Sequence, residues 1–305
     1  MEKLGEIGEH EAIRRLVAGL GKHADLVVGA GDDCAVCRLQ GTGADQVFTT
    51  DPIIENVHFL PSEKPERIGN KAAGRVLSDI AAMGAQPQWL LVNVVAPPEQ
   101  DLQALERIYA GMNALCGHFG ATIIGGDLAQ GPCLEMHVFG TGTLPAGSAL
   151  LRSGAKPGDG IFVTGSLGGS REGKHLDFVP RVEEGIFLRE SGMVDAMMDI
   201  SDGLATDLRH ILGRSGVGAV LDAENIPRVG TLGQALFDGE DFELLFTVSP
   251  RDAVPLLDAW KARFPELRLS CIGRITAAGG LTLRRRNHAP QPLTRHGYDH
   301  FPRSG

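Results

Sequence analysis

Apolar residues near the start of the chain recur with a helical period. Four of them lie three or four positions apart: Ile13, Leu16, Val17 and Leu20. This spacing predicts an amphipathic helix that ends at Gly21. Two short β-type runs follow, at residues 25–30 and 46–50, and both lead into acidic residues. We expect these carboxylates at strand ends, where loops can converge on a ligand.

The alanine-rich run from Ile68 to Met83 predicts a helix packed closely on a sheet. Its apolar stripe consists of Ala72, Val76, Ile80 and Met83. Asp79 lies one residue from this stripe. A carboxylate at the edge of a buried face can reach inward to a site, but a solvated surface aspartate fits the spacing equally well.

Further elements are expected up to residue 144. They are a buried strand from Trp89 to Val95, a helix from Asp101 to Phe119, a strand from Ala121 to Ile124 that leads into Gly125-Gly126-Asp127, and a strand from Leu134 to Leu144. Alternation of strands and helices predicts an α/β fold, with α+β layers.

A domain boundary is expected between Pro145 and Gly160, where proline, glycine and serine accumulate. A strand restarts at Gly160–Gly165, and the polar stretch SLGGSREGKH after it is expected to be a mobile loop. Ser201-Asp202-Gly203 then begins a helix that Gly213 or Gly216 closes. Since 305 residues suit two domains of about 150 residues, we assign residues 1–145 and 146–305 to them.

Composition narrows the function classes. The net charge of −9 argues against a nucleic-acid surface, and we expect the one basic run, Arg284–Arg286, on a solvated hairpin. No run approaches the ~18 apolar residues of a membrane span, and the N-terminus has no apolar signal core. Five cysteines form no regular framework. Cys34 and Cys37 read as structural thiols in a strand, and the protein is expected in the reducing cytoplasm.

Aspartates are the strongest chemical signal. They recur in short clusters: Gly31-Asp32-Asp33, Thr49-Thr50-Asp51, Ser78-Asp79, Gly125-Gly126-Asp127 and Asp199-Ile200-Ser201-Asp202-Gly203. Carboxylates brought together in a core repel one another unless cations separate them. Oxygen ligands without histidine or cysteine suit Mg²⁺ or Mn²⁺, so we expect magnesium-dependent phosphate chemistry.

Each cluster also has a purely structural interpretation. A Gly-Asp turn is commonly only a turn, and Ser201 or Asp202 can cap a helix. Asp199 is not needed for capping, and a helix N-terminus also favours bound phosphate. The phosphate-binding loop G-x-x-x-x-G-K-[ST], the protein-kinase motifs and the G-x-S-x-G elbow are all missing from the sequence. Phosphoryl transfer here would therefore use neither common kinase scaffold.

Taken together, ten segments resemble the thiamine-monophosphate kinase family of the aminoimidazole ribonucleotide synthetase superfamily. They are GAGDDCAV, FTTDPIIENVHF, LSDIAAMGAQP, IIGGD, LLRSGAKPGD, VTGSLG, MDISDGLATDLRHI, GEDFELLFT, CIGRI and GYDHF. They occur in order over nearly the whole chain, and TTD-x6-HF, SDIAAMGA, DISDGL and GEDFEL are the most specific. The SREGKH stretch is shorter than in longer members of the family, which could alter how the site closes.

The resemblance implies that ATP gives its γ-phosphate to thiamine monophosphate, producing thiamine diphosphate and ADP. It also implies a homodimer in which the N-terminal sheets form a shared barrel, with nucleotide and several Mg²⁺ ions in the cleft between the domains.

By position, the resemblance also assigns site residues. The expected metal ligands are Asp33, Thr49, Thr50, Asp51, Asp79, Asp127, Asp199 and Asp202. The expected ATP contacts are Tyr109, Gly126, Asp127, Arg152 and Ser201. The expected substrate contacts are His58, Glu240 and Tyr298. Without the motifs, His58 and Tyr109 would more commonly be core residues, and Arg152 an ordinary surface charge.

Such a reaction needs no general base, because the acceptor phosphate is already ionised near neutral pH, with a second pKa of about 6. Positioning and electrostatics would supply the catalysis. Two alternatives stay open: another ATP-dependent synthetase of the superfamily, of the aminoimidazole ribonucleotide type, and a non-catalytic module that binds Mg-nucleotide. Selenophosphate synthetase is disfavoured, because no cysteine precedes Cys34.

Overall fold

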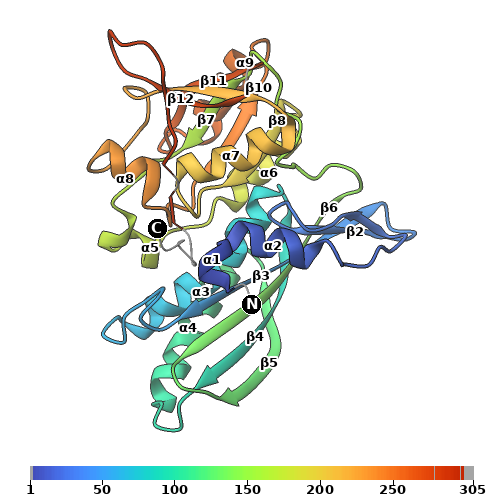
Figure 1. Cartoon of the computed structure of the whole chain (residues 1–305). Helices are drawn as coiled ribbons and strands as arrows, with labels where there is room; N and C mark the ends of the chain where they lie inside the picture. The colour runs from blue at the N-terminus through green and yellow to red at the C-terminus, as the bar shows by residue number, and fades with distance from the viewer. Residues whose placement is uncertain (1–2, 278, 296, 299–305) are drawn as a thin grey trace.

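The computed structural model describes residues 3–277, 279–295 and 297–298, which form two sheets with helices packed on them (Figure 1). A six-stranded sheet has the order β1-β2-β3-β6-β4-β5, and a seven-stranded sheet has the order β13-β12-β9-β11-β7-β10-β8. The α/β architecture with α+β layers is confirmed. Helix α3 packs on β3 of the first sheet and also contacts β8 of the second, so it lies between the two halves.

The first sheet is built from strands before residue 146. Its strands are β1 (Leu26–Val28), β2 (Ala35–Leu39), β3 (Ala44–Ile54), β4 (Gln86–Ala96), β5 (Thr122–Gln130) and β6 (Glu135–Pro145). The helices of this half are α1 (Leu4–Ile7), α2 (Glu9–Val17), α3 (Pro65–Ala82) and α4 (Leu102–His118). Apolar residues of α3 and α4 pack against one face of the sheet, which forms the first core.

The second sheet is covered on both faces. Its strands are β7 (Gly160–Thr164), β8 (Val194–Asp199), β9 (Gly218–Asp222), β10 (Leu244–Val248), β11 (Leu269–Thr276), β12 (Gly280–Arg284) and β13 (Gln291–Pro292). The helices are η1 (Ser170–Glu172), α5 (Lys174–Asp177), α6 (Val182–Ser191), α7 (Leu204–Ser215), α8 (Leu232–Phe237) and α9 (Ala253–Arg263). Successive residues of β7 face different cores, because Ile161 packs with α7 and α8 whereas Phe162 packs with α6 and α9.

Among the residues that the structure describes, none covers the other face of the first sheet in this way. Alternate residues of β4 point away from the helices, and Trp89 and Leu91 are 46% and 38% exposed. Phe48 and Phe139 lie on the same face, with ring centres 6.1 Å apart. We call these four residues, Phe48, Trp89, Leu91 and Phe139, the open face. An apolar sheet face of this kind commonly marks an interaction surface.

Two acidic clusters expected at strand ends lie inside strands, which corrects the prediction. β3 runs through Thr49, Thr50 and Asp51 to Ile54, and β5 runs through Gly126 and Asp127 to Gln130. The error has a physical cause: β2 pairs with β3 only as far as Phe48, while β6 pairs with it to Ile54. The pairing of β3 with β2 therefore stops just before the acidic run, whereas its pairing with β6 continues past that run.

Other elements differ in detail from the predictions. Helix α2 ends at Val17 rather than at Gly21. The strand expected to be buried at residues 89–95 is buried on one face only, because the open face lacks a covering layer. The expected loop after Gly168 contains η1 and α5. Helix α7 ends at Ser215 and, in agreement with the prediction, is capped by Gly216, whose φ of 68° suits glycine.

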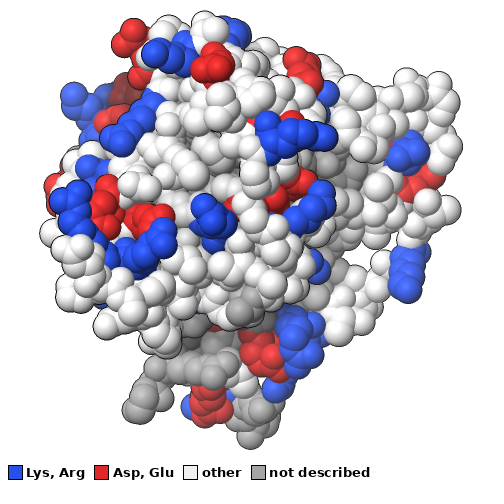
Figure 2. All heavy atoms as spheres, turned by 90° about the horizontal axis from the view of Figure 1, so that it is seen from above, with Lys and Arg blue, Asp and Glu red and all other residues white. Residues whose placement is uncertain are grey.

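Charged residues of both signs share the face of the molecule that is seen from above in Figure 2. In the view down onto the second sheet, lysine and arginine are interspersed with aspartate and glutamate (Figure 2). Arg284, Arg285 and Arg286 are exposed as expected, and Arg284 Nε donates to Asp222 Oδ1 at 2.5 Å. Within the described part of the chain, no helix is long and apolar enough to cross a membrane.

Candidate active site

Three aspartates from distant parts of the chain meet between the two halves of the molecule. Asp33 precedes β2, Asp79 lies on α3, and Asp199 ends β8. They offer carboxylate oxygens within 4.8 Å of one another. Asp33 and Asp199 are buried, and Asp79 is half-buried. We call these three residues the carboxylate cluster.

Burial and mutual repulsion raise the pKa values of the three carboxyl groups in the cluster. Burial raises the pKa of Asp33, and it raises the pKa of Asp79 well above the usual value, with further repulsion from Asp199 and Asp51. Burial and the charge of Asp33 raise the pKa of Asp199 to about 7. In the absence of a cation, the cluster therefore retains protons that isolated carboxylates would lose.

The donor atoms of the cluster fit a hard divalent cation. Oδ2 of Asp33 is buried and has no hydrogen-bonding partner among the described residues. Thr49 Oγ1 donates to Asp79 Oδ2 at 2.6 Å, and Ser78 Oγ donates to Asp199 Oδ2 at 2.6 Å. Mg²⁺ and Mn²⁺ prefer such carboxylate and hydroxyl oxygens.

Two arginines partly balance these acids. Arg152 Nη2 donates to Asp33 Oδ1 at 2.5 Å, and the Arg152 backbone N–H donates to Asp32 Oδ1 at 2.6 Å. Arg75 binds Asp51 through two hydrogen bonds of 2.7 Å each. Guanidinium groups on α3 and on the segment that joins the halves thus supply part of the positive charge that these acids require.

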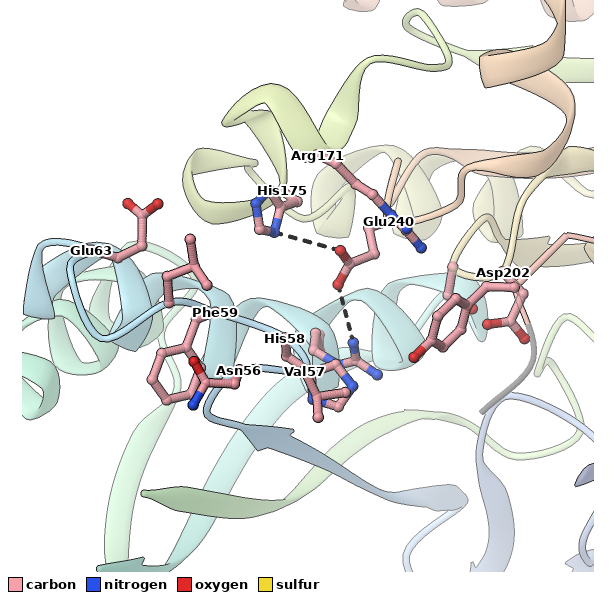
Figure 3. Close-up of a pocket in the computed structure, with 13 residues that line it drawn as sticks. Asn56, Val57, His58, Phe59, Glu63, Arg171, His175, Asp202 and Glu240 are labelled. Carbon is pink, nitrogen blue, oxygen red and sulfur yellow. Dashed lines mark ion pairs between the residues drawn. The ribbon is translucent and has the colours of Figure 1, made fainter. Parts of the chain in front are cut away.

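A pocket of about 240 Å³ lies between the two halves (Figure 3). Arg75 lines it and pairs with Asp51. The polar residues that line this pocket come from both halves: Asn56, His58, Glu63, Arg75, Arg171, His175, Ser201, Asp202, Glu240 and Tyr298. All three residues expected to contact substrate, His58, Glu240 and Tyr298, line this pocket. Ser201 and Asp202, expected to contact ATP and metal, line it too.

The buried Lys71 holds one wall of the pocket. Its Nζ donates to the His58 carbonyl at 2.6 Å, lies 2.5 Å from Glu240 Oε1, and lies 2.7 Å from His175 Nδ1. Burial lowers the pKa of Lys71 to about 8. Burial alone would raise the pKa of Glu240, but the charges of Lys71, His175 and Arg75 lower it, so Glu240 is a carboxylate at neutral pH.

Glu240 has an unusual backbone. Its φ of 55° is in the left-handed region, which is uncommon for a residue other than glycine. Its N–H donates to the Ser201 carbonyl at 2.7 Å, and Ser170 Oγ donates to its carbonyl at 2.5 Å. These contacts hold Glu240 so that its side chain points into the pocket, toward His175 (Figure 3).

An ion pair and hydrogen bonds hold the segment of η1 and α5 against helix α3, beside the same pocket. Arg67 Nη2 pairs with Asp177 at 2.6 Å, and Asn70 Nδ2 donates to the carbonyls of Leu176 and Phe178 at 3.0 and 3.1 Å. On the other side, the Arg171 guanidinium lies 5.2 Å from the centre of the Tyr298 ring. Helix α3 and the C-terminal segment therefore position this part of the pocket wall.

Some predicted site residues lie elsewhere. Tyr109, Gly126 and Asp127 line a separate, open hollow beside β5. Asp127 shares a cross-strand row with Pro52 but is three strands away, a separation of about 14 Å. Within one chain, Asp127 therefore cannot share an ion with Asp51.

Two further metal-ligand candidates also stand apart from the cluster. Thr50 points to the opposite side of β3 from Thr49 and Asp51, because side chains alternate along a strand. Asp202 groups with Asp207 and His210 at the start of α7 rather than with the carboxylate cluster.

Lys71, Arg75 and His175 were not singled out from the sequence. A signal was available for two of them, since Lys71, Arg75 and Asp79 are spaced by four residues and so share one helix face. Charged residues in an alanine-rich helix also suit a solvated face, and only the fold shows that this face is covered.

Comparisons with known proteins identify relatives over the whole chain. The family models "AIR synthase related protein, N-terminal domain" and "AIR synthase related protein, C-terminal domain" match residues 31–144 and 169–286. The thiamine-monophosphate kinase of Salmonella typhimurium is 37% identical over 309 residues, which cover 91% of this chain and 93% of that protein. The enzyme of the same name from Aquifex aeolicus is 30% identical and covers 99% of both.

Solved structures agree with these relatives. The structure described as AaThiL complexed with AMPPCP and TMP superimposes with a TM-score of 0.84 at 28% identity, covering 99% of each chain. Thiamine-monophosphate kinase from Stenotrophomonas maltophilia gives a TM-score of 0.72 at 31% identity, covering 90% of this chain and 94% of that one.

The pKa shifts predict a pH-dependent effect of Mg²⁺ on stability. Asp199 has a folded pKa of about 7, and an unfolded aspartate has one of about 3.9. Between these values the folded protein binds more protons than the unfolded chain, so the cluster's contribution to the free energy of unfolding falls as pH rises. Mg²⁺ competes with those protons. It should therefore raise the thermal midpoint, relative to EDTA, more at about pH 8 than at about pH 5.

Asp199→Asn is the matched variant for this measurement. It removes one of the three cluster carboxylates and should reduce the Mg²⁺ effect at about pH 8, whereas Asp33 and Asp79, whose pKa values are also raised by burial, keep part of the pH dependence. An equal Mg²⁺ effect at both pH values, or an effect at about pH 8 that is as large in Asp199→Asn as in the wild type, would contradict the assignment of the cluster.

Proposed function

The chain belongs to the thiamine-monophosphate kinase family within the AIR synthase related proteins, and from that membership we propose that it transfers the γ-phosphate of ATP to thiamine monophosphate. The products are thiamine diphosphate and ADP. One observation carries the proposal: the carboxylate cluster lies beside a pocket whose wall contains His58, Glu240 and Tyr298. The pair of Arg75 and Asp51 joins the two.

The pocket suits a ligand with a cationic ring and an anionic phosphate. Glu240 offers a carboxylate, and the Tyr298 ring offers an aromatic face, both of which attract a cationic thiazolium. The acids expected to bind metal, Asp51 and Asp79, lie on the other side of Arg75 from Glu240. A thiamine monophosphate molecule would therefore place its ring near Glu240 and Tyr298 and its phosphate toward the cluster.

Mg²⁺ fits the acidic end of the site. Asp33, Asp79 and Asp199 would hold it together, with Asp51 and the Thr49 hydroxyl as neighbouring ligands. Bound there, Mg²⁺ would offset the charge of the two phosphates that must approach each other.

The remaining catalytic work is positioning. The acceptor phosphate is ionised near neutral pH, since its second pKa is about 6, so no side chain has to remove a proton. Lys71 holds His58 and Glu240 in place through their carbonyl and carboxylate oxygens. Arg152 and Ser201, the expected ATP contacts near the cluster and the start of α7, would orient the donor.

A homodimer would complete the nucleotide site. The open face exposes Trp89 and Leu91, and β5 is an edge strand with an unpaired backbone. Asp127 points to the same side of the sheet as this face and is far from Asp51 in its own chain. A second copy docked on the open face would bury the apolar residues. It could also bring Tyr109, Gly126 and Asp127 of one subunit to the cluster of the other.

The reducing cytoplasm is the compartment that suits the chain. All five cysteines are free, and Cys34 is buried next to Asp33. Burial, followed by the charge of Asp79, raises the pKa of the Cys34 thiol well above its usual range. A buried, protonated thiol is inert, which agrees with a structural role.

ADP release with different acceptors tests the proposed function. Thiamine monophosphate with Mg²⁺ should support turnover, whereas free thiamine, an aminoimidazole precursor, or thiamine monophosphate with EDTA should not. Turnover with the aminoimidazole precursor instead would favour a synthetase. Tight binding of Mg-ATP without ADP release from any acceptor would favour a non-catalytic module.

Asp51→Asn is the active-site variant for this assay. It keeps the shape of the side chain but removes a charge next to the carboxylate cluster, so turnover should fall by about 10²-fold or more while the protein stays folded at the assay temperature. Asp222→Asn is the control, because Asp222 pairs with Arg284 on the surface and its loss should leave turnover unchanged. Near-normal activity of Asp51→Asn would contradict the metal assignment.

The oligomeric state tests the proposed dimer. Leu91→Glu places a charge in the open face and should shift the protein from dimer to monomer in sedimentation velocity, with loss of activity. Leu102→Glu is the matched control, because Leu102 is 66% exposed at the start of α4, away from this face. A monomeric wild type, or a Leu91→Glu variant that stays dimeric, would refute the proposed interface.

A further inference from the structure

Helix α3 carries three charged residues in a row along one face. Lys71, Arg75 and Asp79 are each four residues apart, which places them on successive turns of the same side. Lys71 contacts the pocket residues His58 and Glu240, and Asp79 belongs to the carboxylate cluster. Arg75 therefore lies between the substrate pocket and the metal end of the site.

The Arg75 guanidinium contacts acids in both directions. Nε and Nη2 each donate to Asp51 at 2.7 Å. Nη1 lies 3.6 Å from Glu240 Oε1. The side chain is only 12% exposed, yet it lines the pocket.

This arrangement cannot persist unchanged when the site is loaded. A divalent cation bound by Asp51 would face the guanidinium at close range, and two cations there would repel each other. Arginine cannot relieve the repulsion by losing a proton, because its pKa is above 12. The guanidinium must therefore exchange Asp51 for another anion within reach of the pocket.

The other cations that line the pocket already have partners. The Arg171 guanidinium lies over the Tyr298 ring, 5.2 Å from its centre. His175 Nδ1 lies 3.5 Å from Glu240 Oε2. Arg75 lies next to Asp51, a metal-ligand candidate, and its planar fork matches a phosphate in a bidentate manner.

We propose that Arg75 binds the phosphate of the acceptor, and that Asp51 holds the guanidinium in position until the acceptor and a divalent cation arrive. Occupation of Asp51 by the cation releases Arg75, and the released guanidinium orients the acceptor phosphate toward the cluster. Arg75 thus couples the binding of a cation at the carboxylate cluster to the binding of the acceptor in the pocket. The inference rests on the proposed function, because it takes a phosphate monoester as the ligand.

Binding measurements without nucleotide separate this role from a structural one. With Mg²⁺ present, so that Asp51 is occupied, Arg75→Gln should weaken binding of thiamine monophosphate about 10- to 100-fold, from loss of charge-assisted hydrogen bonds. Binding of free thiamine, which lacks the phosphate, should change less than about threefold. The same variant should bind Mn²⁺ more tightly than wild type, because Asp51 no longer has a competing partner. Titration calorimetry on the intact purified protein measures all three.

Two further variants complete the design. Arg75→Lys keeps the charge without the fork, so its loss of affinity for thiamine monophosphate should be smaller than that of Arg75→Gln. It also serves if Arg75→Gln does not fold. Arg107→Gln is the matched control, because Arg107 pairs with Glu66 on the surface, and all three affinities should stay at wild-type values.

The inference requires that Arg75→Gln weakens the binding of thiamine monophosphate and strengthens the binding of Mn²⁺. Equal weakening of thiamine monophosphate and thiamine, or weaker Mn²⁺ binding in Arg75→Gln, would overturn the inference in favour of a structural role. A wild type that releases ADP with thiamine monophosphate, combined with an Arg75→Gln variant of normal affinity, would overturn the inference alone. A wild type that does not bind thiamine monophosphate would overturn both the inference and the proposed function.

Discussion

The repulsion among Asp33, Asp79 and Asp199 is the constraint on which the site depends. Three carboxylates within 4.8 Å of one another, two of them buried, cannot all be ionised without positive charge nearby. Hydroxyl groups of Thr49 and Ser78 donate to two of them, but hydroxyls bring no net charge. The fold nevertheless brings these acids together from the loop before β2, from α3 and from the end of β8. The repulsion among these carboxylates is accounted for if divalent cations bind to them during function.

Helix α3 converts this constraint into an ordered site. Its cationic residues face the substrate pocket and its acid faces the cluster, so the electrostatic potential changes sign along one helix face. Lys71 fixes the wall that contains Glu240, and the segment of η1 and α5 is fastened to the same helix through Arg67 and Asn70. Once divalent cations occupy the cluster, a phosphate is favoured at that end and a cationic ring is favoured beside Glu240, so thiamine monophosphate has one favourable orientation.

Much of this was predictable from the sequence, and the exceptions have physical causes. The periodic stripes placed the helices of residues 68–83 and 101–119 within three residues of α3 and α4 at each end, because burial of one face dominates helix sequences. Alternation predicted β3 but not the point where its pairing with β2 stops, so Asp51 was expected at a strand end. Trp89 was expected to be buried. The run of apolar residues in β4 does not distinguish a sheet face that helices cover from an exposed face that another molecule could cover. Lys71 and Arg75 become interpretable only once Glu240 and Asp51 lie beside them.

Crystallographic location of Mn²⁺ by its anomalous scattering tests the central claim most directly. Crystals grown with Mn²⁺ and a non-hydrolysable ATP analogue should show an anomalous peak bounded by the carboxylates of Asp33, Asp79 and Asp199, with Asp51 freed from Arg75. An empty carboxylate cluster in crystals that hold Mn²⁺ and nucleotide elsewhere, with the pair of Arg75 and Asp51 intact, would contradict the account.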